Sequence, residues 1–528
     1  LSVLQLLPAS ARYTQGEILF SPDGNKCISL LNQSGRQLAK LRGDEIAMIF
    51  QEPMTSLNPV LTCGRQVMEA IMRHRGANRL QAMQQTTGLF SRVKLPDPTG
   101  MLKRYPHQLS GGQQQRVMIA MAMSCSPSLL IADEPTTALD ATVQKAILGL
   151  LKELQQQSDM GVIFITHDLG VVREIADRVA VLYKGELVEQ GPVDQIFRQP
   201  AHAYTRALLA CRPALYPRGT RLPVVRDFMQ ETPSSIPGET YAATLRETPA
   251  SVPAQELFPA SAEPEKPPNV LLTVQDLSVW FPGRKSLTGS VRTFMKAVDG
   301  VSFQVFKGET LGLVGESGCG KTTLGKTLLK LINPVSGTIS FKGRELTGLS
   351  PAGMRTLRKD MQLIFQDPYA ALNPSLTVGQ ALMEPLRVHR IYPRVRQRRE
   401  KVMEMLEKVS LSPEYFNRYP HEFSGGQRQR IVIARALILN PSFIVCDESV
   451  SALDVSVQAQ VLNLLNDLKK EFDFTAIFIS HDLAVIRYIS DRILVMNKGK
   501  IVEEGPAESV YNHPTTDYTR TLIAAIPI

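Results

Sequence analysis

The sequence predicts an α/β fold made of two tandem copies of one domain, and two observations lead to this prediction. First, residues 104–120 (RYPHQLSGGQQQRVMIA) recur as residues 418–434 (RYPHEFSGGQRQRIVIA), 314 positions later, and the same offset relates Asp133 to Asp447. Second, apolar stretches of strand length alternate with patterns of helical period, as a parallel sheet with crossover helices requires. A constant offset over several segments indicates a duplicated domain.

The second copy shows its expected elements most clearly. Alternating apolar residues from Val270 onward predict a first strand. Residues 376–439 lack strand patterns and predict a mostly helical insertion, which carries the basic run from Arg387 to Lys401. A solvated helix face explains that run better than contact with anionic lipid. Parallel strands are expected at 310–314, 442–446, 476–480 and 493–496, with a helix over 324–332.

The predicted boundaries are residues 1–212 for the first copy, 213–269 for a linker and 270–528 for the second copy. The linker contains eleven prolines among Ala, Ser, Thr and Glu, a composition typical of a semi-extended spacer. Its short apolar cluster at Leu222–Val225 is a candidate for local docking. Leu1–Pro8 resembles the middle of a helix and aligns with Lys326–Asn333, so we expect the chain to begin inside the first domain.

A glycine-rich loop lies between the predicted strand at 310–314 and the following helix. It reads GESGCGKT and matches the G-x-x-x-x-G-K-[ST] phosphate loop, whose backbone N–H groups and helix N-terminus hold an anion. Lys321 would reach the β and γ phosphates, and the Thr322 hydroxyl would ligate magnesium. A structural turn is the alternative for such a pattern, but the strand and helix around it favour the phosphate loop. The predicted nucleotide-binding residues are Gly315, Glu316, Ser317, Gly318, Cys319, Gly320, Lys321, Thr322 and Thr323.

Two adjacent acids follow another predicted strand. Asp447 and Glu448 end the sequence FIVCDE, and His481 follows the next strand 34 residues after Asp447. An acid in this position can hold magnesium, and a second carboxylate can activate the attacking water. Paired acids also start ordinary turns, but the first copy repeats the same residues at the same spacing, as Asp133, Glu134 and His167.

Together these motifs resemble the ATP-binding cassette (ABC) ATPases, because SGGQ followed by QQR or RQR is similar to the signature of that family. The resemblance covers both copies and leaves out the linker. It implies that each copy has a RecA-like core, an antiparallel β subdomain and a helical subdomain. It also implies the cofactors ATP and Mg2+, with Thr322, Gln366 and Asp447 at the metal. Catalytic roles would fall to Glu448 as general base, His481 at the γ phosphate and Gln366 at the water, and to the counterparts Glu134, His167 and Gln51.

The family's signature acts on nucleotide held by another cassette. By resemblance, Ser110, Gly111, Gly112 and Gln113 would close over ATP at the loop of the second copy, making an intramolecular pseudodimer. The second signature, Ser424, Gly425, Gly426 and Gln427, would face a first copy in which residues 1–50 contain no G-x-x-x-x-G-K. A helix N-cap with a glycine hinge is the alternative for SGGQ alone, but its duplication together with the other motifs argues against this alternative. Phe281 is the candidate to stack on adenine, ahead of Trp280.

Each copy ends in a similar tail, residues 201–213 and 513–527, which resembles the C-terminal extension of dipeptide, oligopeptide and nickel importer ATPases. That resemblance implies the ATP-hydrolysing motor of an importer for peptides (dipeptide, oligopeptide or glutathione). It also implies two transmembrane permease subunits, a solute-binding protein reached through them, no nucleic acid, and the cytoplasmic face of a bacterial inner membrane. Both tails depart from the usual H-P-Y pattern, and Ser449 stands where the family has proline.

The composition sets wider limits. With 43% apolar and 21% charged residues, the chain is typical of globular proteins, and its 528 residues exceed one hydrophobic core. No apolar run approaches the roughly 18 to 20 residues of a membrane span. The six cysteines lack C-x-x-C spacing and predict reduced thiols. The net charge of +9 does not discriminate between partners.

The rival prediction is a soluble twin-cassette factor of translation. Such factors carry a charged, helical linker between cassettes, whereas the linker here is rich in proline. Cassette ATPases of DNA repair need a large insertion before the signature, and about 58 residues between Gln366 and Ser424 leave no room for it.

Overall fold

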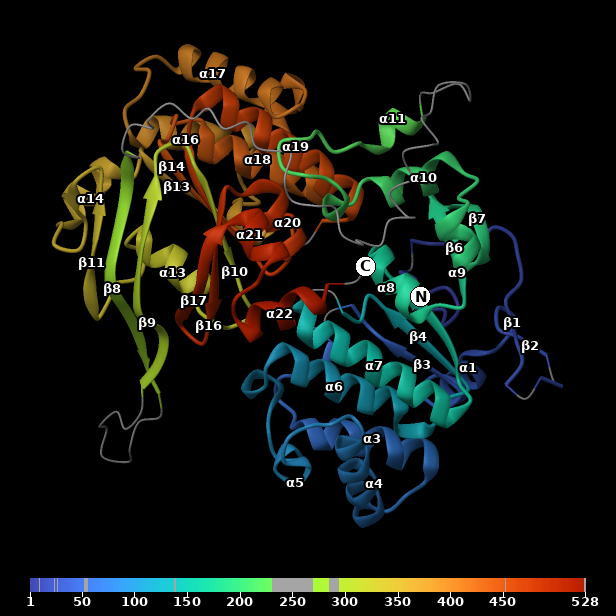
Figure 1. The fold of residues 1–528 in the computed structure, drawn as a ribbon. Helices are drawn as coiled ribbons and strands as arrows, with labels where there is room; N and C mark the ends of the chain where they lie inside the picture. The colour runs from blue at the N-terminus through green and yellow to red at the C-terminus, as the bar shows by residue number, and fades with distance from the viewer. Residues whose placement is uncertain are drawn as a thin grey trace, which may run out of the picture. The chain divides into compact units, whose positions relative to one another are not determined.

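The computed structural model describes residues 1–8, 10–22, 24–25, 27–51, 56–136, 139–229, 269–283, 294–451 and 453–526. The chain forms two compact units, Leu1–Asp177 and Arg178–Ile528 (Figure 1). Most of the predicted linker, residues 230–268, lies outside the described residues, as do parts of the motifs at 52–55, 137–138 and 452 and the last two residues of the chain. The predicted boundaries at 212 and 270 therefore stay predictions.

A six-stranded sheet forms the core of the second unit. Its order is β13-β14-β15-β10-β16-β17, and neighbouring strands are parallel except for the antiparallel pair β16 and β17. The sheet confirms the four predicted parallel strands within one or two residues at each end. The strands are β10 (Thr310–Val314), β13 (Met361–Ile364), β14 (Phe443–Asp447), β15 (Thr475–Ser480), β16 (Arg492–Asn497) and β17 (Lys500–Pro506).

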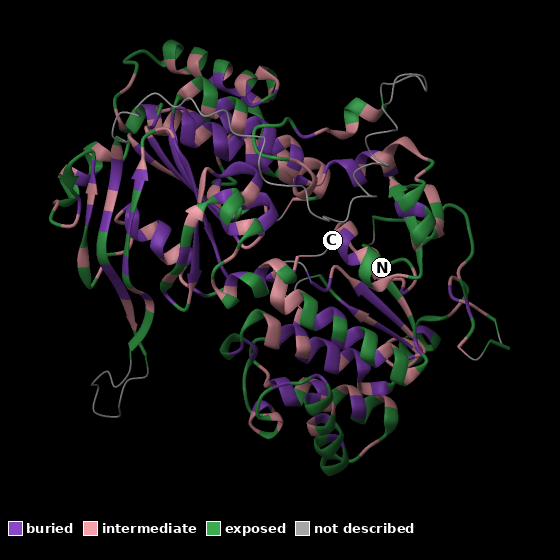
Figure 2. Ribbon diagram, viewed as in Figure 1, coloured by how far each residue is buried: buried purple, intermediate pink, exposed green. Residues whose placement is uncertain are grey.

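Both faces of this sheet are covered, which explains why its strands are continuously apolar. Successive side chains of a strand point to opposite faces, and β14 shows the division: Phe443 and Val445 belong to one hydrophobic core, whereas Ile444 and Cys446 belong to the other. The first core includes α13 (Lys321–Leu328) and the antiparallel sheet. The second includes the helices α18 to α20. Figure 2 shows the buried strands between these layers.

An antiparallel sheet has four strands in the order β12-β11-β8-β9. Two of these strands, β8 and β9, precede the glycine loop in the sequence, and β11 and β12 follow it. The predicted first strand is confirmed as β8, and it pairs with β9 along most of its length. The strands are β8 (Val270–Pro282), β9 (Phe294–Phe306), β11 (Ser336–Phe341) and β12 (Arg344–Glu345).

The predicted helical insertion is also confirmed, since residues 376–439 contain helices and no strand. Its helices begin with good caps: Thr377 caps α16 and Ser424 caps α18, each through a capping box. The helices between residues 351 and 437 are α14 (Pro351–Leu357), α15 (Pro368–Ala371), α16 (Val378–Val388), α17 (Val395–Lys408), η4 (Pro413–Asn417), η5 (Pro420–Glu422) and α18 (Gly425–Leu437). The helices α19 (Val455–Phe472), α20 (Leu483–Ile489), α21 (Ala507–Asn512) and α22 (Asp517–Ala524) follow.

The first unit repeats part of this plan. Its parallel sheet has the order β3-β4-β5 and corresponds to β13-β14-β15. Its strands are β1 (Leu19–Phe20), β2 (Ile28–Ser29), β3 (Ile46–Ile49), β4 (Leu129–Asp133) and β5 (Gly161–Ile165). Its helices are α1 (Gly35–Leu41), α3 (Cys63–Arg75), α4 (Arg79–Arg92), α5 (Pro98–Met101), η1 (Pro106–Gln108), α6 (Gly111–Ala122), η2 (Met123–Cys125), α7 (Ala141–Ser158) and α8 (Leu169–Ile175).

The expected helix at Leu1–Pro8 is wrong, because the structure has turns there. Gln5 has a positive φ of 48°, and the N–H of Leu6 donates to the carbonyl of Leu1. This is the 6→1 bond that closes the C-terminal end of a helix. The aligned segment of the second copy has the same geometry just after α13, with Lys330 at φ 51°. The segment is therefore a turn with the geometry of the one that follows α13, and not helix interior.

Residues 178–229 belong to the second unit. They form β6 (Arg178–Tyr183), β7 (Glu186–Pro192), α9 (Val193–Arg198), α10 (Ala203–Ala210), η3 (Pro213–Leu215) and α11 (Val225–Met229). β6 and β7 are antiparallel. The start of the predicted linker thus contains short helices and is packed against the second copy.

We call residues 216–225 the docked segment, because polar contacts hold it on α19 and α20. The Asn463 side chain accepts from the Leu222 N–H at 3.0 Å and donates to the Leu222 carbonyl at 2.8 Å. The Tyr488 hydroxyl donates to the Thr220 carbonyl at 2.7 Å. Leu222 is 1% exposed, which confirms the predicted docking of this apolar cluster.

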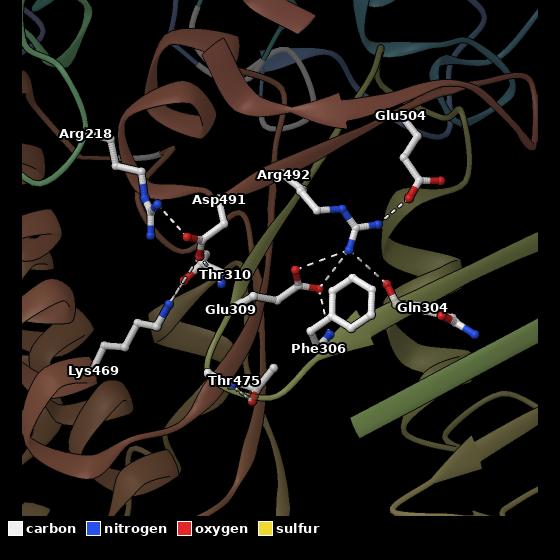
Figure 3. Close-up of polar contacts among 11 residues, drawn as sticks. Arg218, Gln304, Phe306, Glu309, Thr310, Lys469, Thr475, Asp491, Arg492 and Glu504 are labelled. Atoms are coloured by element: carbon white, nitrogen blue, oxygen red, sulfur yellow. Dashed lines mark hydrogen bonds and ion pairs between the residues drawn. The ribbon is translucent and has the colours of Figure 1, made fainter. Parts of the chain in front are cut away.

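An ion pair adds to this attachment. Arg218 of the docked segment contacts Asp491, which also accepts from the Thr310 N–H at 2.7 Å and lies 3.6 Å from the Lys469 ammonium (Figure 3). The neighbouring Arg492 pairs with Glu309 in the same view. The docked segment is therefore connected to the strand that leads into the glycine loop.

Candidate functional site

The glycine loop follows β10 and leads into α13, as predicted. Gly320 has a φ of 111° and stands at the N-cap position of α13. A Cβ at Gly320 would lie 2.1 Å from the carbonyl oxygen of Ala297, and one at Gly315 would lie 2.1 Å from that of Met496. Only glycine therefore fits at these two positions, and the loop can place backbone N–H groups around a ligand at the start of α13.

Lys321 is the first residue of α13 and is 4% exposed. Its ammonium donates to the carbonyls of Gly315 at 2.7 Å and Glu316 at 2.9 Å. A buried ammonium needs such partners, so the loop holds its own cation in place. Cys319 is 7% exposed, and burial raises the pKa of its thiol, which makes it a packing residue.

Thr322 and Asp447 meet beside the loop. The Thr322 hydroxyl donates to the Asp447 carboxylate at 2.9 Å. Asp447 ends β14 and is 3% exposed. Burial raises the pKa of Asp447, as does the charge of Glu448, although the Thr322 hydrogen bond and nearby lysines act in the opposite direction. A buried carboxylate next to a hydroxyl offers the hard oxygen donors that Mg2+ prefers, and a bound cation would offset the cost of burial.

Glu448 lies at the centre of a second group of polar side chains. Its carboxylate accepts from the Gln366 side chain at 2.7 Å and lies 3.6 Å from the His481 ring. Burial opposes ionisation of Glu448, but the close approach and charge of His481 outweigh it, so the pKa of Glu448 is lowered. Burial likewise opposes protonation of His481, but Glu448 and Asp482 outweigh it and its pKa is raised. This pairing keeps the carboxylate ionised and able to accept a proton.

The first copy brings its three predicted residues together in the same way. Glu134 accepts from the Gln51 side chain at 2.7 Å and contacts the His167 ring at 2.9 Å. Glu134 has a φ of 45°, and its counterpart Glu448 has a φ of 47°. The repeated left-handed conformation turns the carboxylate at the end of the strand toward glutamine and histidine in both copies.

The two signature sequences begin helices. Ser110 caps α6 and Ser424 caps α18, and each hydroxyl accepts from the N–H of the glutamine three residues later at 3.4 Å. Both serines are exposed. A Cβ at Gly426 would lie 2.3 Å from a methyl of Val457 on α19, so the glycine permits close helix packing. In this structure both SGGQ sequences cap a helix, and an anion site at either of them stays a prediction.

Phe281 lies near the end of β8 and is partly buried against the core that includes α13. Trp280 lies under the Lys296 ammonium, 5.0 Å from the ring centroid, and near Phe294. Stacking of Phe281 on adenine stays a prediction.

Sequence reasoning missed two residues next to this site. Tyr518, in the second tail, accepts from the N–H of Glu316 in the glycine loop at 3.0 Å. Glu503, on β17, accepts from the backbone N–H groups of Thr515 at 2.8 Å and Thr516 at 3.2 Å. The repeat contained a signal for both, since Tyr204 and Glu189 occupy the same positions 314 residues earlier.

Within the described residues, no helix is both long and apolar enough to cross a membrane. Nor do the described His, Cys, Asp and Glu residues form a group of three or more suited to holding a metal ion. The site predicted for Mg2+ at Thr322 and Asp447 is of another kind, because it combines one carboxylate with one hydroxyl.

Known proteins resemble the whole chain. The family model described as ABC transporter matches residues 2–137 and 298–451. The model described as oligopeptide/dipeptide transporter, C-terminal region, matches residues 188–240 and 502–528, and these two stretches contain the two tails.

Curated relatives are similar over the full length of the chain. The glutathione import ATP-binding proteins GsiA of Shigella sonnei and of Escherichia coli K12 are 49% and 48% identical, each over 100% of this chain and 82% of the relative. That of Pectobacterium atrosepticum is 49% identical over 97% of this chain and 80% of the relative. Among solved structures, the chain is similar to the dimeric bacterial ABC transporter cassette MJ0796, with 26% identity, a TM-score of 0.41, and coverage of 45% of this chain and 99% of that one.

The family models and relatives agree with the duplicated fold and with the two tails. The chain therefore belongs to the ATP-binding cassette transporter family, as an ATP-binding ATPase with two cassettes and two C-terminal regions of the oligopeptide/dipeptide type.

Proposed function

We propose that the chain is the ATP-hydrolysing motor of an importer for peptides, with glutathione and short peptides as the substrate class. The observation that carries this proposal is the convergence of Lys321, Thr322, Asp447 and Glu448 at the end of one parallel sheet. The substrate class is supported by the names of the relatives and by the two C-terminal regions. Those regions favour an importer over a translation factor.

The residues divide the work of hydrolysis between them. Backbone N–H groups of the loop and the Lys321 ammonium bind the phosphates of ATP. Thr322 and Asp447 would hold Mg2+, which supplies positive charge to the phosphates. Glu448 accepts the proton of the attacking water, which Gln366 orients, while His481 contacts the γ phosphate. The lowered pKa of Glu448 keeps its carboxylate ionised at neutral pH, so that it carries no proton of its own when the water attacks.

Coupling to transport requires other subunits. We propose two membrane permeases as partners, reached at the cytoplasmic face of the membrane, with a solute-binding protein outside. We also propose that the first signature, Ser110 to Gln113, completes the ATP site at Gly315–Thr322 when the cassettes close. The exposed serine and the N–H groups at the start of α6 would supply a second anion contact.

Reconstitution tests this function. The full chain is placed in vesicles with the two permeases and the solute-binding protein encoded by neighbouring reading frames, and uptake of labelled glutathione and a dipeptide is measured with Mg-ATP. We expect uptake that needs ATP and is abolished by Lys321→Ala. Hydrolysis without uptake of either substrate would contradict the substrate class, and uptake that survives Lys321→Ala would contradict the motor site.

A further inference from the structure

A hydrogen bond connects the C-terminal tail of the second copy to the glycine loop. The Tyr518 hydroxyl accepts from the N–H of Glu316 at 3.0 Å, although the two residues are 202 positions apart. Tyr518 is the second residue of α22 and is partly buried, with its ring against the helical core. The tail thus reaches the loop directly.

The bond acts on a peptide group that also holds Lys321. The Gly315–Glu316 peptide donates its N–H to Tyr518 and accepts the Lys321 ammonium at its carbonyl, 2.7 Å away. The next carbonyl, of Glu316, accepts from the same ammonium at 2.9 Å. An ammonium has three N–H donors, and these two bonds leave the third directed toward the Cys319 sulfur, 4.0 Å away. The orientation of the peptide therefore sets where Lys321 presents this third, weakly bonded donor.

Tyr518 is itself held in place by the sheet. Glu503 on β17 accepts from the N–H of Thr515, from the N–H and hydroxyl of Thr516, and from the Thr519 hydroxyl at 2.5 Å. Burial alone would raise the pKa of Glu503, but these hydrogen bonds lower it to about 2. β17 pairs with β16, which pairs with β10, the strand before the loop. One sheet therefore fixes both ends of the Tyr518 contact.

We propose that Tyr518 is a positioning residue for the phosphate loop, and that the C-terminal tail sets the ATP affinity of the second cassette through it. With the hydroxyl in place, the Gly315–Glu316 peptide keeps Lys321 preorganised for phosphate. Without it, the peptide can turn and the loop must order itself when ATP binds. The tail thereby acts on binding rather than on the chemical step. The inference rests on the proposed ATP site at this loop.

Tyr518→Phe in the full chain tests the inference by removing the hydroxyl and keeping the ring. We expect the Kd for ATP, and the KM of hydrolysis, to rise about fivefold, which corresponds to the roughly 1 kcal/mol of one hydrogen bond. The kcat at saturating ATP is expected to stay within twofold. Fluorescent-nucleotide binding and steady-state hydrolysis measure the two quantities separately.

Two further variants make the result specific. Tyr511→Phe removes a phenolic hydroxyl from the neighbouring helix α21, where the ring packs on Arg487, and is expected to leave KM unchanged. Glu503→Gln keeps Tyr518 but weakens its anchor, and is expected to raise KM by a smaller factor than Tyr518→Phe.

The outcomes separate this inference from the function on which it rests. If Lys321→Ala abolishes ATP binding while Tyr518→Phe leaves KM unchanged, the positioning role is wrong. Equal effects of Tyr511→Phe and Tyr518→Phe, or a loss of kcat at unchanged KM, would also overturn it. If Lys321→Ala leaves ATP binding intact, the loop is not the ATP site, and the proposed function fails first.

Discussion

The two copies keep the same group of glutamate, glutamine and histidine but differ in the sheet around it. In both, glutamate, glutamine and histidine meet at the end of a strand, with the glutamate in the same left-handed conformation. In the second copy β15 is buried along its whole length, because β14 and β10 pair with it on either side. In the first copy the described sheet is β3-β4-β5, and alternate residues of β5, including Ile163 and Ile165, are exposed.

The difference teaches which parts of the site depend on local sequence. The group around Glu134 forms from β3, β4 and β5, and those strands are present in the first unit. The geometry of the glycine loop instead depends on β10, on its neighbour β16 and on β9 of the antiparallel sheet, because Gly315 and Gly320 approach the carbonyls of Met496 and Ala297. The glutamate group is therefore a property of three strands, whereas the glycine loop requires strands of two sheets.

The largest expected effect separates the two glutamates. Glu448→Gln should lower kcat for ATP hydrolysis at least 100-fold while ATP still binds, because loss of a general base typically costs 10² to 10⁴. Glu134→Gln should change kcat less than twofold, since the chain has one G-x-x-x-x-G-K-[ST] loop, at Gly315–Thr322. Steady-state hydrolysis and nucleotide binding measure both variants. Equal losses in the two would contradict the assignment of the base.

The docked segment gives a second contrast between the copies. The Asn463 side chain holds both backbone groups of Leu222, but the position 314 residues earlier is Gly149, which is exposed on α7. Asn463→Ala should lower the free energy of unfolding of the second unit by roughly 2 to 3 kcal/mol, because two buried backbone groups lose their partner. Gly149→Ala should stabilise by about 0.5 to 1 kcal/mol, because alanine favours the helix interior.

Chemical denaturation and limited proteolysis between residues 216 and 229 check these opposite signs. We expect proteolysis of the docked segment to become faster in Asn463→Ala and to be unchanged in Gly149→Ala. A destabilised Asn463→Ala protein whose docked segment resists protease as before would contradict the attachment through this side chain.

The two glutamates that hold the tails, Glu503 and Glu189, predict that the stability of the fold depends on pH. Glu503 has a folded pKa of about 2 against an ordinary value of 4.5, so it stabilises the fold above pH 4.5 and loses this contribution as the pH falls toward 2. Glu189, which accepts from the N–H groups of Ala201 and His202, also has a lowered pKa. Glu503→Gln should flatten the dependence of the unfolding midpoint on pH between 4.5 and 2, and Glu189→Gln should flatten it less. An unchanged slope in Glu503→Gln would contradict the anchor.

Much of the second copy could be predicted from its sequence, because its strands are buried on both faces and read as continuous apolar runs. The strand at 310–314 agrees with β10 at both ends, and the acids at 447 and 448 fall where a strand end places them. Motif spacing could locate these residues in the sequence, because each of them lies at the end of a strand in the same sheet.

Contacts between segments far apart in the sequence could not be predicted in this way. The Tyr518 hydroxyl reaches Glu316 only after β16, β17 and α22 have folded, and Asn463 meets Leu222 across 241 positions. Neither contact is marked by a periodic pattern in the sequence. The turn at Leu1–Pro8 was missed because Gln5, and not glycine, takes the left-handed conformation there.

The smallest expected effect concerns the residue after Glu134 and after Glu448. Ser449 is buried, and among the described residues its hydroxyl has no hydrogen-bond partner, whereas the first copy has Pro135 at this position. Since Glu134 and Glu448 share one backbone conformation, proline should fit at 449. Ser449→Pro should stabilise the second unit by about 0.5 to 1 kcal/mol, by removing the buried hydroxyl and restricting the unfolded chain. A denaturation midpoint that falls would show that the Ser449 N–H or hydroxyl is needed in the folded protein.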